Sequence, residues 1–263
     1  MISRKPLSDQ PSVRSPWFWV PSLYFAQGIP YVAVMIVSVL MYKRLGVSNT
    51  DIALYTSWLN LPWVIKPFWS PFVDLLKTKR WWVVTMQLLI GAGLAGVAFT
   101  IPTTFFFQAS LAVFWLLAFS SATHDIAADG FYMLALDSHE QAFFVGIRST
   151  FYRIAIIAGQ GVLVMFAGFL ENNTGNIPLA WSITFFILGG LFLGLFLYHR
   201  YILPLPEGDK PSVTVTPSTI VKEFFATFVS LFQKETSFCR DPVHVVVPFS
   251  GSPVGKIGNP FPG

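Results

Sequence analysis

Long uncharged stretches separate the short charged segments of this chain. No Asp, Glu, Lys, Arg or His side chain occurs from Pro16 to Tyr42 or from Trp81 to Thr123. About 18 consecutive apolar residues already indicate a helix that crosses a membrane. The pattern therefore predicts an all-α membrane protein with several spans.

Six spans are expected between residues 16 and 198, each near the roughly 20 residues that cross about 30 Å of hydrocarbon. They are 16–42, 51–74, 81–101, 105 to beyond 125, 144–170 and 178–198. The second is interrupted by Pro62, Lys66, Pro67 and Pro71. Interruptions of this kind normally face protein or a cavity, where the freed backbone groups find partners.

The segments on either side of this bundle are expected to lie in the cytoplasm. Residues 1–15 form a polar tail, and residues 199–238 form a Pro/Ser-rich linker with an amphipathic helix on the membrane surface. The apolar face of that helix runs from Ile220 to Phe232 with a spacing of four residues. Residues 239–263 contain no apolar window long enough for a seventh span. A truncated or frame-disrupted reading frame is the expected explanation.

Lysine and arginine set the expected orientation. With the amino terminus inside, the cytoplasmic segments contain Arg4, Lys5, Arg14, Lys77, Lys79, Arg80, Arg200 and Lys210. The opposite side has Lys43 and Arg44. Because cytoplasmic loops are enriched in basic residues, both ends of the chain are expected in the cytoplasm.

Composition narrows the class further. The chain is 54% hydrophobic and 11% charged, whereas a soluble domain has about 25% charged residues. The single cysteine excludes an internal disulfide framework and a Cys-rich metal site. The formal net charge of +4 is small and spread over loops, so a lipid bilayer is the expected partner and nucleic acid is not. No cofactor is expected.

Acidic residues follow abruptly on one uncharged stretch, in SSATHDIAADGFYM (120–133). Asp125 and Asp129 are four residues apart, so both carboxylates lie on one helix face. An ionised side chain at the centre of a span costs about 2.5–3.5 kcal/mol. A carboxylate kept there can bind and release a proton, which transport driven by a proton gradient requires. Alternatively, the span ends here and the acids meet water, or they pair structurally with Arg148 and Arg153.

Three basic side chains are the possible partners of these acids. Arg148 and Arg153 are about 140° apart around a helix, so they cannot both face the same group. Lys66 precedes Asp74 by eight residues, which places it about 12 Å from the end of its span. It either snorkels to water or pairs with a substrate or a carboxylate in a central cavity.

The position of His124 beside the two aspartates suggests two alternatives to proton coupling: a metal site and a hydrolase active site. Ligands at His124, Asp125 and Asp129 are poorly aimed at one metal ion, because each residue turns the side chain by about 100°. No second His/Glu cluster would complete the coordination. Ser120 and Ser121 are too close to His124 for a hydrolase triad, and no Gly-x-Ser-x-Gly elbow occurs. Neither a metal site nor an enzyme is expected.

Three motifs together resemble the AmpG-type muropeptide permeases and the related acetyl-CoA transporters, which are branches of the major facilitator superfamily. The motifs are LYFAQGIPYV (23–32), IKPFWSPFVDLLKTKR (65–80) and SSATHDIAADGFYMLAL (120–136). The chain departs from the family where Ser70 replaces a glycine. It also departs at Tyr132 and Leu134, where many relatives have a basic and an acidic residue.

The resemblance implies one six-span half, arranged as 3+3 helices, of a twelve-span carrier. It implies proton-driven import of cell-wall sugar-peptide fragments across a bacterial inner membrane, with the substrate bound between two halves. A second half or a second copy is the implied protein partner. The rival interpretations are a half that does not transport and has a structural or regulatory role, and a carrier of another amphipathic solute.

The resemblance also implies roles for individual residues. Asp125, Asp129 and His124 would serve proton coupling or substrate binding, with Lys66 as their charge partner. Asp74, Lys79 and Arg80 would form a cytoplasmic gate. Gln27, Gly28 and Pro30 would shape the cavity by kinking the first span, and Arg148 and Arg153 are possible ion-pair partners of the acids.

Overall fold

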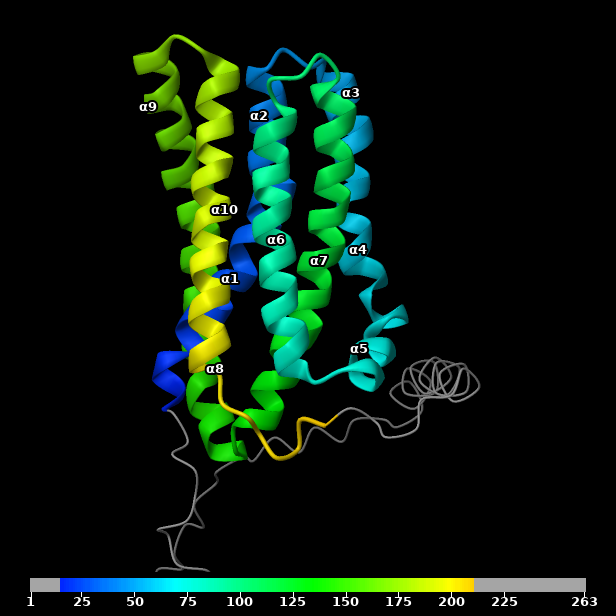
Figure 1. Cartoon of the computed structure of the whole chain (residues 1–263), viewed down its shortest axis with the longest axis vertical. Coiled ribbons are helices and arrows are strands. Elements are labelled where there is room, and N and C mark those ends of the chain that lie inside the picture. The colour runs from blue at the N-terminus through cyan, green and yellow to red at the C-terminus, as the bar shows by residue number, and fades with distance from the viewer. Residues whose placement is uncertain (1–14, 211–263) are drawn as a thin grey trace, which may run out of the picture. The chain divides into compact units, whose positions relative to one another are not determined.

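The computed structural model describes residues 15–210, and every regular element in that range is a helix (Figure 1). The α-helices are α1 (Val20–Val32), α2 (Ser38–Arg44), α3 (Asn49–Thr56), α4 (Leu61–Ile65), α5 (Ser70–Leu76), α6 (Lys79–Thr100), α7 (Phe106–Ala135), α8 (Ser138–Ala158), α9 (Val164–Thr174) and α10 (Ile177–Ile202). Within this range, five helical stretches are long and apolar enough to cross a membrane: Pro16–Arg44, Lys79–Thr100, Phe106–Ala135, Ser138–Thr174 and Ile177–Ile202. The all-α, multi-span prediction is confirmed.

The five stretches correspond to five of the predicted spans, with ends that differ by a few residues. The fifth begins earlier than expected, at Ser138, because Asp137 and Glu140 form a capping box at its start. The fourth continues to Ala135. Asp125 and Asp129 therefore lie inside a long helix rather than at its end.

The predicted second span, 51–74, is not one continuous helix. It consists of α3, α4 and α5, which are joined by 3-10 turns. Pro62, Pro67 and Pro71 each lack a backbone N–H, so an uninterrupted helical hydrogen-bond ladder is impossible. Figure 1 shows α3, α4 and α5 following one another beside α7. The sixth crossing stays a prediction, and this broken segment would provide it.

The predictions for the two ends of the chain are not tested by this structure. The amphipathic helix between Ile220 and Phe232, the tail 239–263 and nearly all of the tail 1–15 lie outside the described residues. The last helix, α10, extends to Ile202, and the chain from there to Lys210 returns to the start of α6.

Small residues bring α6 and α10 into close contact. A Cβ atom added at Gly91 would lie 3.2 Å from the Cβ of Phe192 and 3.3 Å from the carbonyl oxygen of Gly189. One added at Gly189 would lie 3.0 Å from the carbonyl oxygen of Gly91. Helices in membranes commonly associate in this way, because lipid supplies little hydrophobic drive for their packing. Figure 1 shows α10, α6 and α7 side by side.

The first and fifth stretches are distorted where they meet. A π-helical turn, Ala33–Val37, follows Pro30 in the first, and another, Gly159–Leu163, joins α8 to α9. A Cβ atom at Gly159 would lie 2.0 Å from Cγ1 of Val32, so a larger residue there would force Val32 to shift. The first stretch stays helical through the Gly28-Ile29-Pro30 sequence, and its π-helical turn begins three residues after Pro30.

Gly28 joins α1 to α8 by a similarly close approach. A Cβ atom there would lie 2.7 Å from the Cβ of Ala155 and 2.9 Å from the carbonyl oxygen of Tyr152. We expect Gly28→Ala to lower the midpoint of thermal unfolding in detergent, because overpacking costs about 1–3 kcal/mol. Gly168→Ala is the matched control, since nothing lies within 4 Å of that Cβ position. Equal midpoints for the two variants would contradict a tight α1–α8 contact.

Candidate functional site

Asp125 is buried where α7 faces α1 and α4, with 7% of its surface exposed. Its Oδ2 accepts a hydrogen bond of 3.2 Å from Nε1 of Trp63. The Gln27 side chain on α1 lies close enough to act on this carboxylate, but by hydrogen-bond geometry neither Oδ1 of Asp125 nor the buried Oε1 of Gln27 has a partner among the described residues. Buried acceptors are rarely left unsatisfied. The carboxylate of Asp125 can therefore take up a proton, and both oxygens can accept a hydrogen bond from a donor on a bound molecule.

Lys66 lies in the 3-10 turn between α4 and α5, near Asp125. Its charge acts on the Asp125 carboxylate, as does the charge of Asp129 one turn further along α7. The direct ion pairs found among the described residues do not include Lys66. The break in the second predicted span thus brings a cation close to a buried acid without joining the two.

Asp129 has different surroundings. Its Oδ1 accepts a hydrogen bond of 3.0 Å from the hydroxyl of Tyr24, and the guanidinium of Arg148 lies 3.7 Å from the same oxygen. Arg148 also donates to the Tyr24 hydroxyl at 3.1 Å. The side chain of Asp129 is 40% exposed. This acid is therefore compensated by a cation and linked to α1 and α8, whereas Asp125 has no direct ion pair.

Arg148 and Arg153 point to different surroundings. The guanidinium of Arg148 lies over the rings of Tyr24 and Tyr132, at 5.0 and 5.1 Å from their centres. Arg153 is exposed. Tyr132 thus helps to hold an arginine that α8 supplies.

His124 does not join the two aspartates. Its Nε2 lies 3.1 Å from Nε2 of Gln87 on α6, and Oε1 of Gln87 lies 3.0 Å from Nδ1 of His199 on α10. Nε2 of His199 lies 3.0 Å from Oγ of Ser22 on α1. Consecutive helical residues differ by about 100° in direction, which is why His124 and Asp125 face different neighbours.

The hydrogen bonds of this buried chain can all be formed with neutral imidazoles. When the Gln87 amide donates to His124, its oxygen accepts from His199, and the other nitrogen of His199 accepts from the Ser22 hydroxyl. A further proton on Nε2 of His124 would oppose the amide N–H of Gln87. We name Ser22, Gln87, His124 and His199 the histidine network. It joins four helices and needs no charge.

The three residues expected to form a gate do not all contact one another: Asp74 and Lys79 form a pair, and Arg80 contacts the end of α10. Lys79 forms an ion pair with Asp74, and its stem lies against Gly130 of α7, where an added Cβ would be 2.9 Å from Cε of Lys79. Arg80 instead donates to the carbonyl oxygens of Leu203, at 3.3 Å, and Arg200 at the end of α10. Of these two contacts, the Asp74–Lys79 pair is the one that joins the broken segment to α6.

The sequence pattern of the BT1 family matches residues 25–238. The chain belongs to the BT1 family. It is 29% identical over 261 residues to "Putative transporter AmpG 4" of Rickettsia conorii, which covers 91% of this chain and 58% of that protein. It is 28% identical over 224 residues to "Anhydromuropeptide permease" of Escherichia coli K12, which covers 82% of this chain and 42% of that protein.

These matches confirm the resemblance to AmpG-type permeases that the three motifs indicated. Together with the apolar helices, they identify an integral membrane protein of a transporter family. The chain spans about half the length of the curated relatives it matches.

The opposite end of the BT1 bundle has a polar cluster around the buried Glu171, which the sequence pattern did not predict. Glu171 of α9 forms an ion pair with Arg44 of α2 and accepts a hydrogen bond of 2.7 Å from Nε1 of Trp181 on α10. The signal was present, because Glu171 is the one acid near the end of the predicted fifth span. Gln87 is likewise a polar residue inside a predicted span, and His199 lies just past the predicted end of the sixth span.

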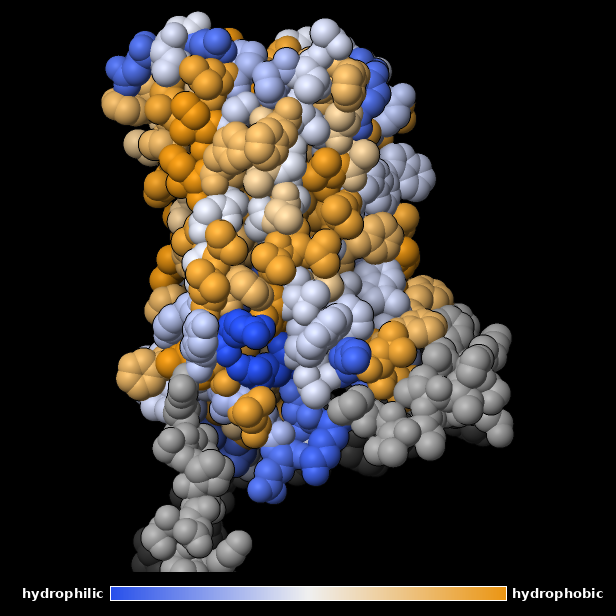
Figure 2. Space-filling model, viewed as in Figure 1, coloured by the Kyte–Doolittle hydropathy of each residue, from blue (hydrophilic) through white to orange (hydrophobic). Residues whose placement is uncertain are grey.

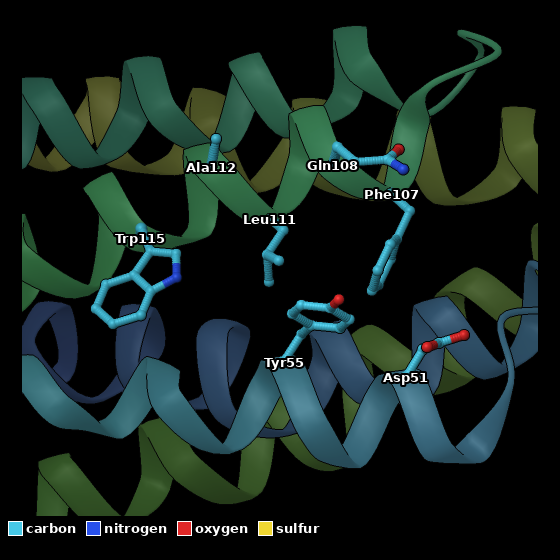
Figure 3. A pocket seen from close by; sticks show the side chains of 7 residues that line it. All are labelled: Asp51, Tyr55, Phe107, Gln108, Leu111, Ala112 and Trp115. Atoms are coloured by element: carbon cyan, nitrogen blue, oxygen red, sulfur yellow. The ribbon is translucent and has the colours of Figure 1, made fainter.

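An open cleft lies between α3 and the first turns of α7 (Figure 3). Its lining residues are Asp51, Tyr55, Phe107, Gln108, Leu111, Ala112 and Trp115. The rings of Tyr55 and Phe107 face each other edge to face at 5.7 Å. Trp115 precedes Asp125 by ten residues, about 15 Å along the helix, so the cleft is separate from Asp125 and Asp129.

No three His, Cys, Asp or Glu side chains in residues 15–210 are grouped to hold a metal ion.

Proposed function

We propose that this chain is the proton-binding part of a secondary transporter that imports cell-wall sugar-peptide fragments across a bacterial inner membrane. Membership of the BT1 family and the name of the Escherichia coli relative support the substrate class. The substrate would bind between this bundle and a second bundle, which is either a further part of the protein or a second copy. Rocking of the two bundles would expose it to each side in turn.

Asp125 is the residue on which the proton coupling depends. A buried carboxylate that is ionised and unpaired costs several kcal/mol. Two arrangements avoid this cost: the carboxyl group holds a proton, or Lys66 moves into direct contact with it. Because Lys66 lies in a turn of the broken segment, the second arrangement requires that segment to move. Gain or loss of one proton would thus favour different conformations.

Asp129 has a supporting role in this proposal. Its contacts with Tyr24 and Arg148 hold α7 against α1 and α8, and its exposed fraction leaves it accessible to a cationic group of the substrate. Gln27, whose amide oxygen is buried without a partner, is placed to accept from a substrate hydroxyl or amide. Gly28 and Pro30 fix the path of the helix that presents Gln27.

The gate would be the contact between Asp74 and Lys79. These residues lie at the bundle end where Lys77, Arg80, Arg200 and Lys210 also occur, which we name the basic end. The positive-inside rule assigns the basic end to the cytoplasm. Separation of the Asp74–Lys79 pair would free the broken segment from α6 and open the cytoplasmic side.

Uptake into membrane vesicles tests the proposal. Vesicles containing the full chain should accumulate radiolabelled anhydromuropeptide when the outside is made acidic, and an uncoupler should stop accumulation. Vesicles from cells without the protein are the control. Uptake that ignores the uncoupler would refute proton coupling. No uptake above the control would refute the substrate, and would favour a structural role for the bundle.

A further inference from the structure

A groove runs between α6 and α10 at the basic end, on the outer side of the bundle. It has a volume of about 350 Å³. Figure 2 shows a hydrophilic patch at the lower ends of α6 and α10, directly below a broad hydrophobic band on the same helices. The groove is distinct from the site around Asp125, because Asp125, Trp63 and Gln27 are not among its lining residues.

The polar end of the groove is positively charged. Arg200 is exposed, and the ion pairs found among residues 15–210 do not include its guanidinium. Arg80 lies in the same wall. The ammonium of Lys77 is 6.0 Å from the ring centre of Trp81 at the rim. Together these side chains form a binding surface for an anionic group.

Asp209 also lines the groove, but its charge is already compensated. Its carboxylate oxygens accept hydrogen bonds from the backbone N–H groups of Lys79, at 2.6 Å, and Arg80, at 3.0 Å. These N–H groups lie in the first turn of α6, where they have no partner within the helix and where the helix dipole is positive. An anion would therefore bind on the Arg200 side of the groove and not at the helix terminus.

The other end of the groove is apolar. Trp81, Val84 and Leu88 follow one another on one face of α6, and Phe196 faces them from α10. Leu88 lies about 10 Å further along α6 than Trp81, toward the middle of the span. Trp81 is 44% exposed, as expected for a tryptophan at the membrane–water interface. The groove thus changes from cationic to apolar over the depth of a lipid headgroup.

We propose that this groove binds an anionic phospholipid. The phosphate would contact Arg200, the glycerol would lie beside Thr85, and one acyl chain would follow Val84, Leu88 and Phe196. A choline headgroup is disfavoured because it would place a further cation beside Arg200 and Lys77. A bound lipid would also cover the segment 203–209, which follows α10 and is hydrogen-bonded to the start of α6 through Asp209. The lipid would thereby stabilise the position of this segment.

Competition between two lipids with identical acyl chains tests this site. The full chain in mild detergent is mixed with equal amounts of phosphatidylglycerol and phosphatidylcholine, and the bound lipids are counted by native mass spectrometry. We expect phosphatidylglycerol to be retained preferentially. Arg200→Gln should reduce that preference about fivefold, since one basic side chain near an anionic headgroup contributes about 1 kcal/mol. Arg200→Lys should keep most of it.

Lys43→Gln removes a positive charge at the opposite end and is the matched control, which should bind phosphatidylglycerol as the unaltered chain does. Equal binding of the two lipids, or equal effects of Arg200→Gln and Lys43→Gln, would overturn the proposal. Excess inorganic phosphate should not displace the lipid. Full displacement would identify a site for a free anion instead. A thermal unfolding scan of each variant verifies that it is folded.

Discussion

We expect Asp125→Asn to abolish the proposed accumulation of substrate against its gradient and to leave the protein folded in the membrane. Asparagine has nearly the size of aspartate and still accepts the hydrogen bond from Trp63, but it does not exchange a proton near neutral pH. One-for-one coupling converts a gradient of one pH unit, about 1.4 kcal/mol, into about a tenfold accumulation. The variant should level off at equal concentrations inside and outside. Labelled anhydromuropeptide in energised vesicles measures the difference.

Asp137→Asn is the matched control for this experiment. Asp137 is an exposed acid that caps α8, and asparagine caps a helix about equally well, so accumulation should be unchanged. A tenfold accumulation by Asp125→Asn would remove this residue from the coupling mechanism. In that event Asp129, with its direct contact to Arg148, would be the next candidate.

Most of the helix arrangement could be predicted from the sequence, because a membrane restricts what a spanning segment can be. In hydrocarbon, the backbone must satisfy its hydrogen bonds internally, so long uncharged runs such as 81–123 have to be helical. Pro102-Thr103-Thr104 within this run correctly indicated the turn between the third and fourth spans. The segment 51–74 was harder, because three prolines and a lysine mark an interruption without saying how the chain continues through it.

The partners of the polar side chains could be predicted less well. The spacing of Asp125 and Asp129 correctly placed them on one helix face, but spacing does not say which neighbouring helix that face meets. His124 was therefore grouped with the acids by its position in the sequence. Its real neighbours, Gln87 and His199, come from helices far along the chain, and only tertiary packing brings them together.

Gln87→Leu is expected to produce the largest loss of stability. Leucine fills the space of the glutamine side chain but offers neither a donor to His124 nor an acceptor to His199. Each buried polar atom left without a partner costs about 1–3 kcal/mol. Because the two imidazoles lose their shared partner together, we expect the midpoint of thermal unfolding in detergent to fall by several degrees. Intrinsic fluorescence or light scattering on heating measures it.

Gln108→Leu makes the same chemical change at an exposed position of α7 and should leave the unfolding midpoint almost unaltered. Adding His199→Phe to Gln87→Leu should recover part of the loss, because removing both partners of a hydrogen bond is far less costly than removing one. Such a recovery would measure the coupling between α6 and α10 directly. If Gln87→Leu unfolds at the same temperature as Gln108→Leu, the histidine network does not hold the four helices together. The bundle would then owe its rigidity to its glycine-mediated contacts.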